Sequence, residues 1–372
     1  MGLACVGAMT VVAALMAGTE CFAGGSAPAL QERELSAPAA WAALERGDAA
    51  KAAGIFREEL DRSPRNPMLY YGAGYAAFML GRSDAAISSL KRAIEYNPRF
   101  ILAMVLLSQV AYQTADLDLA LRTMEKAAAL APGDRAIAQQ LEQWRSESAL
   151  HNRFEERPGA RFRVLFEGAA EKTVSDRVAG VLESVYWSIG KRLNSYPAET
   201  LTVILYTNRQ FQDITRAPAW AGGGYDGRIR LPVEGALRSP KTLDRVVTHE
   251  FVHAVITNAA PRGVPTWIHE GLASYLESSD RSWATRVLQS ADDRIPLDDL
   301  ADGFDRFDGR TALVAYAQSL VGGQLLCERL GANVGPFLQM LGSGHTVDQA
   351  LSTHGVQADA FYAEWRARIG VK

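Results

Sequence analysis

A spacing of 34 residues runs through the first third of the chain and limits how it can fold. Pro64, Pro98 and Pro132 lie 34 residues apart. Three other kinds of residue recur at fixed distances before each proline. They are a small residue (Ala52, Ala86 and Ala120), a larger apolar residue (Phe56, Leu90 and Met124) and a turn residue (Gly47, Gly81 and Ala115). A unit that recurs at this period, with small and large side chains in fixed register, predicts a stack of identical helical motifs.

This pattern resembles the tetratricopeptide repeat, a pair of antiparallel helices of 34 residues. The resemblance implies an all-α solenoid over residues 36–150, with about three repeats before residue 132. Residues 134 to 149 are expected to close the array with a helix whose apolar stripe contains Ile137, Leu141 and Trp144. Repeat arrays more often bind partners than catalyse reactions, so we expect this domain to bind a protein partner or to brace its neighbour.

A second pattern, H-E-x-x-H, occupies residues 249–253 within an apolar run. On a helix, His249 and His253 stack on one face and can direct two imidazoles at one point, as a zinc ion requires. Glu250 lies about 100° further round the helix. That position suits a general base acting on a water molecule that the metal activates, rather than a ligand.

A catalytic zinc needs a third protein ligand and one open position. The segment Trp267-Ile-His-Glu-Gly-Leu-Ala273 follows after a turn at residues 261–265, with Glu270 and His269 as rival ligands. The arrangement resembles the gluzincin metallopeptidases, whose third ligand is a glutamate on a following helix. The resemblance, and the apolar Ile268 and Leu272 beside it, favour Glu270. One Zn²⁺ held by His249, His253 and Glu270 is therefore the expected cofactor.

The same resemblance organises residues 151–372 as a zincin-like metallopeptidase domain with a small sheet and an active-site helix. The pattern predicts strands over 161–167 and 201–207, helices over 170–192 and 208–215, and a strand over 228–233 with edge character. We expect the zinc helix to begin at Asp244 and residues 281–310 to form a polar surface segment that carries Leu297 and Leu300 onto the core. Helices are expected to follow over 312–321 and near 323–341, 347–353 and 357–368. The fold class is thus α+β: a helical solenoid, then a peptidase-like domain.

Two further site residues come from the resemblance. Aminopeptidase N-type relatives use a tyrosine downstream of the glutamate ligand to stabilise the oxyanion, which makes Tyr316 the candidate here. A Tyr that only packs its helix on the core is the alternative. Thermolysin-type relatives carry an aspartate where this chain has Ser274, so Glu277 or another carboxylate is expected to orient a ligand instead.

The N-terminus predicts export. Residues 3–18 are apolar and small residues follow up to Ala23, which is typical of a signal peptide over 1–23, although its first residues carry no Lys or Arg. A linker over 24–35 comes next. The protein is then periplasmic or secreted, with no membrane contact beyond this segment, and Cys327 is the single cysteine after cleavage. A net charge of −3 gives no indication of nucleic-acid binding.

These patterns predict a zinc-dependent peptidase that hydrolyses a peptide or protein substrate with Glu250 as base. The chain lacks the Gly-x-Met-Glu-Asn signature of aminopeptidases, which favours internal cutting. The alternative is a catalytically inactive, repeat-based scaffold or adaptor whose zinc is structural. That alternative requires a fourth protein ligand, for which His269 is the candidate.

Overall fold

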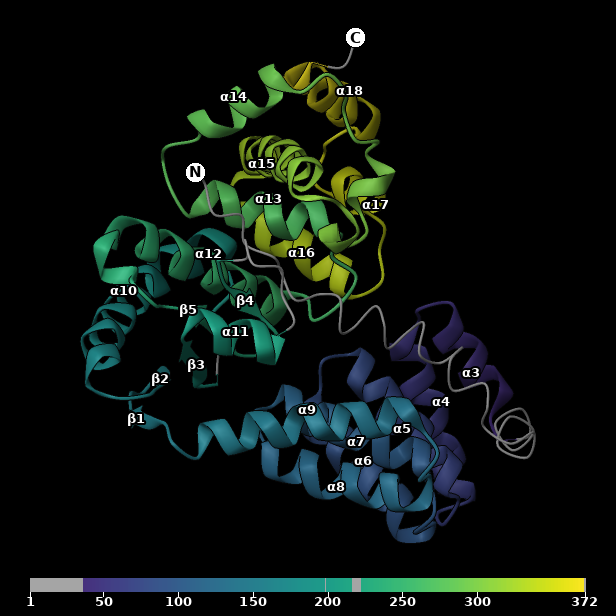
Figure 1. The fold of residues 1–372 in the computed structure, drawn as a ribbon. Helices are drawn as coiled ribbons and strands as arrows, with labels where there is room; N and C mark the ends of the chain where they lie inside the picture. Colours follow the sequence, from purple (N-terminus) through teal and green to yellow (C-terminus); the bar gives the residue numbers. More distant parts are fainter. Residues whose placement is uncertain (1–35, 198, 216–221, 371–372) are drawn as a thin grey trace. The chain divides into compact units, whose positions relative to one another are not determined.

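The computed structural model describes residues 36–197, 199–215 and 222–370. They form two compact units that divide between Arg153 and Phe154 (Figure 1). The expected signal peptide and linker, residues 1–35, lie outside the described residues. Within the described ranges, no helix combines the length and the hydropathy needed to cross a bilayer.

The first unit is a series of helix pairs, as the 34-residue spacing predicts. Its described helices are α3 (Pro38–Glu45), α4 (Ala49–Arg62), α5 (Pro67–Met79), α6 (Ser83–Tyr96), α7 (Ile101–Gln113), α8 (Leu117–Leu130) and α9 (Arg135–His151). Side chains of Asp48, Asn66, Asp116 and Asp134 accept hydrogen bonds from the first backbone N–H groups of their helices. These caps fix where the helices begin.

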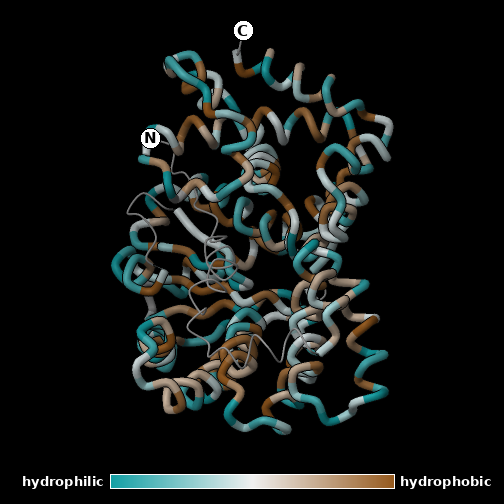
Figure 2. Tube along the Cα trace, turned by 90° about the vertical axis from the view of Figure 1, so that its right-hand side faces the viewer, coloured by the Kyte–Doolittle hydropathy of each residue, from teal (hydrophilic) through white to brown (hydrophobic). Residues whose placement is uncertain are grey.

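The register of the repeats matches the interlocking positions. Ala52, Ala86, Ala120, Phe56 and Leu90 are fully buried, and Met124 is 1% exposed. The closing helix α9 buries its predicted stripe of Ile137, Leu141 and Trp144. Hydrophobic and hydrophilic residues alternate along the helices, as expected for elements with one buried face (Figure 2).

The second unit is mostly helical around one small sheet. Its strands are β1 (Glu155–Arg157), β2 (Phe162–Phe166), β3 (Leu201–Tyr206), β4 (Gly224–Tyr225) and β5 (Ile229–Pro232), and its α-helices are α10 (Ala169–Leu193), α11 (Asn208–Thr215), α12 (Pro240–Ala259), α13 (Thr266–Leu276), α14 (Ser282–Ser290), α15 (Gly309–Leu330), α16 (Val334–Gly342), α17 (Val347–Thr353) and α18 (Ala358–Ile369). Single-turn helices lie at Ala236–Arg238, Asp298–Leu300, Phe304–Arg306 and Gly331–Asn333. A helical repeat region followed by a domain with a small sheet confirms the predicted fold class.

The sheet corrects the predicted edge strand. Its order is β1-β2-β3-β5-β4, with β2, β3 and β5 parallel and the outer strands antiparallel. The strand predicted over 228–233 is β5, which lies inside the sheet between β3 and β4 rather than at its edge. The edge is the two-residue β4, whose Gly224 pairs with Arg230. A short segment such as Ile229-Arg-Leu231 fits either an inner or an edge strand, and only its pairing with β3 and β4 shows which it is.

Two helical predictions were wrong in detail, and one helix was not predicted. The helix containing H-E-x-x-H begins at Pro240, one turn before Asp244, because proline suits the first helical position. The segment 281–310 buries Leu300 as expected, but it also contains α14, which was not predicted and which buries Ala284 and Leu288. Helix α15 continues through Gly322 and Gly323, where two separate helices were expected.

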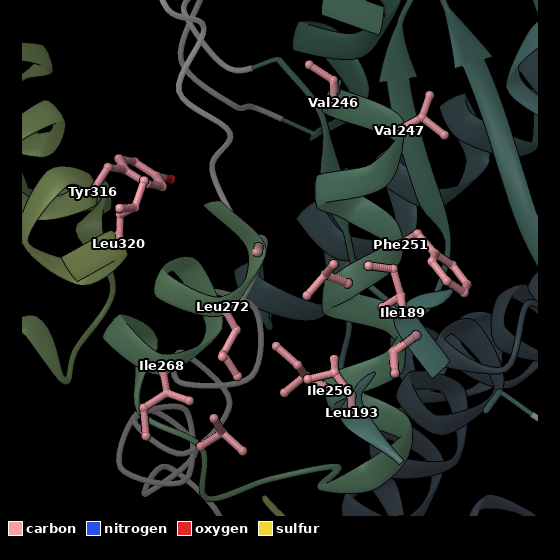
Figure 3. Close-up of a cluster of buried hydrophobic side chains, with 14 of the residues drawn as sticks. Ile189, Leu193, Val246, Val247, Phe251, Ile256, Ile268, Leu272, Tyr316 and Leu320 are labelled. Carbon is pink, nitrogen blue, oxygen red and sulfur yellow. The ribbon is translucent and has the colours of Figure 1, made fainter. Parts of the chain in front are cut away.

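The core of this unit joins the sheet to the helices that carry the candidate site. Leu205 and Ile229 of the sheet belong to the same buried cluster as Phe251 of α12 and Leu272 of α13. Figure 3 shows Leu272 of α13 facing Ile256 of α12, with Ile268 one turn before it on α13. On its other side α13 approaches α15 so closely that a side chain at Gly271 would collide with the Ser319 carbonyl oxygen. Helix α13 is thus held tightly between α12 and α15.

Candidate metal centre

Helix α12 presents the two histidines on one buried face. His249 and His253 are 1% and 3% exposed, and their ring centroids lie 4.8 Å apart. Every residue from Val246 to Ile256 is buried, because α12 has protein packed on all sides at this level. A histidine pair four residues apart in such a place is fixed in position before any ligand arrives.

Helix α13 brings Glu270 to the same point. Helix α12 ends at Ala259, and the chain turns through Gly263, whose φ of +80° only glycine adopts easily, before α13 begins at Thr266. Oε2 of Glu270 lies 3.3 Å from Nε2 of His249 and 3.7 Å from Nε2 of His253. The ligand atoms of the three residues all lie within 4.8 Å of one another.

The donor set fits a divalent metal. Two imidazole nitrogens and one carboxylate oxygen are the ligands that zinc takes in catalytic sites. Nε2 of His253 is buried and makes no hydrogen bond among the described residues. A buried polar atom without a hydrogen bond is costly, and a metal ion at this point would satisfy it.

His249 is held from its other side by Glu277. Nδ1 of His249 lies 2.7 Å from Oε2 of Glu277, and Nε of Arg245 lies 3.5 Å from the other carboxylate oxygen. Burial opposes a charge on His249, but the hydrogen bonds to Glu270 and Glu277 outweigh it and raise the pKa of His249 to about 10. Glu277 was anticipated as a substitute for the carboxylate missing at Ser274.

The neighbouring histidines are kept neutral. Burial lowers the pKa of His253 to about 3 and that of His269 to about 4. Neutral imidazole is the form that binds a metal. His269 lies beside His253, with ring centroids 5.6 Å apart, but the group of described residues able to hold an ion comprises His249, His253 and Glu270.

Glu250 is fully buried on α12, one residue beyond the first ligand. The backbone of Gly223, directly before β4, lies against its carboxylate: a Cβ built on Gly223 would stand 2.8 Å from Oε1 of Glu250. The sequence did not predict this contact. Its one signal for a close backbone approach is the run of three glycines at residues 222–224.

Tyr316 is placed in the core of the second unit. It is 3% exposed on α15, its ring meets the Phe304 ring edge-on, and Figure 3 shows it beside Leu320. Its predicted role at an oxyanion stays a prediction.

Arg245 was not identified as part of the site from the sequence, because a surface arginine near a helix start is ordinary.

Comparison with known proteins assigns both units. Residues 191–371 match the family model of the Peptidase MA superfamily, and residues 38–94 and 80–135 match that of the tetratricopeptide repeat. No curated protein matches the chain. The chain therefore carries tetratricopeptide repeats and a Peptidase MA superfamily domain.

Several solved structures are similar to parts of this chain. The first tetratricopeptide domain of Spaghetti, bound to an HSP90 peptide, is 19% identical, with 32% of this chain and 94% of that chain covered and a TM-score of 0.30. The Sgt2 domain from Aspergillus fumigatus is 22% identical, with 34% and 86% covered and a TM-score of 0.31. The myosin chaperone UNC-45 from C. elegans is 13% identical, with 83% and 31% covered and a TM-score of 0.31.

Proposed function

We propose that the second unit is a zinc-dependent peptidase. The observation that carries the proposal is the convergence of His249, His253 and Glu270 from two neighbouring helices, with Glu250 beside the first ligand. The match of residues 191–371 to the Peptidase MA superfamily supports it. His249, His253 and Glu270 would hold the ion. Zinc bound there would supply a Lewis acid that lowers the pKa of a water molecule from ~15.7 to about 7.

Glu250 is the proposed base. Its carboxylate takes a proton from water as the oxygen attacks the peptide carbonyl, and it passes that proton to the leaving amine. Full burial keeps solvent from competing for the carboxylate, and the packing of Gly223 restricts where it can point. Tyr316 remains the proposed donor to the oxyanion.

A catalytic ion is favoured over a structural one. A closed structural site has four protein ligands, whereas the described residues offer three, and His269 is not among them. The scaffold alternative would need His269 to rotate into the cluster. Three protein ligands leave one coordination position for water and substrate.

The repeats are proposed to bind the substrate or another protein. Their family commonly presents a binding surface, and the described part of the first unit carries no group of histidine and carboxylate ligands comparable to that of the second. We also propose that the protein acts after export, on the strength of the apolar segment at residues 3–18 and the small residues that follow it.

The test compares wild type with Glu250→Gln and with a matched surface variant, Glu183→Gln. Zinc content is measured by metal analysis, and cleavage by digestion of a peptide library. We expect all three proteins to bind one zinc, and only Glu250→Gln to lose cleavage, by a factor of about 10² or more. Equal cleavage by wild type and Glu250→Gln would disprove this assignment.

A second arm separates the catalytic site from the structural alternative. His269→Ala should keep its zinc, because His269 is not a proposed ligand, whereas His253→Ala should lose it. Loss of zinc in His269→Ala, together with no cleavage by wild type, would favour the scaffold with a closed site.

A further inference from the structure

The imidazole of His249 lies between two carboxylates, one in α13 and one at the residue that caps its end. Its Nε2 is 3.3 Å from Oε2 of Glu270, and its Nδ1 is 2.7 Å from Oε2 of Glu277. The two glutamates are seven residues apart, which is about two helical turns; Glu270 lies in α13, and Glu277 caps the end of that helix with helical backbone angles. Helix α13 and its C-terminal cap therefore contact both nitrogens of a single ring on α12.

Helix α12 in turn contacts both oxygens of Glu277. Arg245 and His249 are four residues apart and share a face of α12. Nε of Arg245 lies 3.5 Å from Oε1 of Glu277, while His249 takes Oε2. The Glu277 side chain is 9% exposed. Its carboxylate is thus held at both oxygens and largely shielded from water.

We propose that Glu277, held in place by Arg245, is the positioning residue that prepares His249 to bind the metal. A carboxylate only accepts, so Nδ1 carries the proton that it donates to Glu277. Nε2 faces the Glu270 carboxylate in the metal-free protein, and when a metal ion takes the place of the proton on Nε2, the lone pair of this nitrogen is already directed toward His253 and Glu270. This inference rests on the proposed function in taking those three residues as the metal ligands.

The arrangement also explains the serine at position 274. Ser274 is buried, 4% exposed, one turn after Glu270, at the position where thermolysin-type enzymes carry an aspartate. Here the carboxylate comes one turn later still. The longer glutamate side chain reaches His249 from there, and Arg245 supplies the charge that keeps it in place.

The test measures metal affinity rather than activity. Zn²⁺ dissociation constants of the full chain are obtained by competition with a chromophoric chelator, for wild type, Glu277→Ala, Glu277→Gln and Arg245→Ala. The absorption spectrum of the Co²⁺-substituted protein reports the ligand geometry. Asp280→Asn is the matched control, because Asp280 is a nearby carboxylate bonded to Ser282 rather than to His249.

Removing an orienting partner typically weakens metal binding by about 10- to 100-fold. We expect Glu277→Ala to fall in that range with an altered Co²⁺ spectrum. Glu277→Gln should lose less, because its amide oxygen still accepts from Nδ1, and Arg245→Ala should lie between Gln and wild type. Asp280→Asn should match wild type. If Glu277→Ala fails to fold, the nearly isosteric Gln variant and Arg245→Ala carry the test.

The inference would be overturned if the Glu277 and Arg245 variants had the zinc affinities and Co²⁺ spectra of wild type. This holds even if the melting temperatures of the metal-free variants fell, because lower stability with unchanged metal binding would indicate a purely structural role. A wild type that binds zinc tightly yet cleaves no peptide would end the peptidase proposal and leave this inference standing. A wild type that binds no zinc would overturn both.

Discussion

Gly223 lies directly against Glu250, so that a methyl group at its Cα would stand 2.8 Å from Oε1 and 3.1 Å from the carboxyl carbon. The loop before the edge strand β4 and the middle of α12 therefore meet at the proposed base. The atom in the way is the end of a flexible side chain. A side chain at position 223 can be accommodated by moving the carboxylate, with little cost to the fold.

Gly223→Ala should therefore damage catalysis far more than stability. We expect the turnover number to fall by about tenfold or more, since a base misplaced by 1 Å loses much of its effect. Zinc content should be unchanged, because Gly223 contacts Glu250 and not the metal ligands. Peptide cleavage kinetics, metal analysis and thermal unfolding measure the three quantities.

The matched control is Gly180→Ala, in the middle of the exposed face of α10. No atom lies within 4 Å of a Cβ there, and alanine is a better helix former than glycine. This variant should keep full activity and gain about 0.5–1 kcal/mol of unfolding free energy. Full activity in Gly223→Ala would show that Glu250 needs no clearance at this loop.

Gly271→Ala, in contrast to Gly223→Ala, should lower the stability of the fold strongly. A Cβ at Gly271 meets the Ser319 carbonyl and stands 3.1 Å from the backbone nitrogen of Gly323, and neither can rotate away. Helices α13 and α15 must then separate, which costs about 1–3 kcal/mol or more. Because Glu270 is the adjacent residue, zinc affinity should fall as well. Urea unfolding and chelator competition test this, and unchanged stability would mean that the helices are less tightly packed than described.

Local patterns in the sequence predicted part of the fold and of the candidate site. The 34-residue spacing predicted that Phe56 and Ala86 are buried, because equivalent positions of successive repeats pack in the same way. The i, i+4 spacing placed His249 and His253 on one face because helical geometry is local. Glu270 was favoured by its resemblance to a known ligand, and the structure brings it to the two histidines.

The remaining features depend on contacts between distant segments. Two helices were expected to meet near residue 322, yet α15 runs through Gly322 and Gly323, where the absence of side chains permits close packing. The edge position of β4 follows from a two-residue pairing too short to leave a pattern. Arg245 could not be linked to Glu277 because 32 residues and a turn separate them in the sequence.

Cys327 should be a slow nucleophile. It is partly buried on α15, and burial raises the pKa of its thiol from 9.0 to about 11, although nearby Arg192 and Arg281 oppose the shift. At pH 8 the thiolate fraction is about a hundredfold lower than for an unperturbed thiol. In a background of Cys5→Ser and Cys21→Ser, alkylation by iodoacetamide should be slow at pH 8, keep rising between pH 9 and 11, and become fast in guanidinium. A plateau near pH 9 in the folded protein would contradict this.

The last prediction concerns the turn inside each helix pair of the repeats. Gly47, Gly81 and Ala115 hold equivalent positions with φ of 80°, 69° and 61°. Two glycines adopt this left-handed conformation freely, whereas alanine is strained there by about 1–2 kcal/mol.

Ala115→Gly should therefore stabilise the repeat unit by about 0.5–1 kcal/mol, because relief of this strain exceeds the added entropy of the unfolded chain. The reverse change, Gly47→Ala, should destabilise it by about 1 kcal/mol. No atom lies within 4 Å of a Cβ at Gly47, so that loss reflects the backbone alone. Thermal unfolding of the two variants beside wild type measures both shifts. A lower melting temperature for Ala115→Gly would show that the third turn has lost the conformation of the first two.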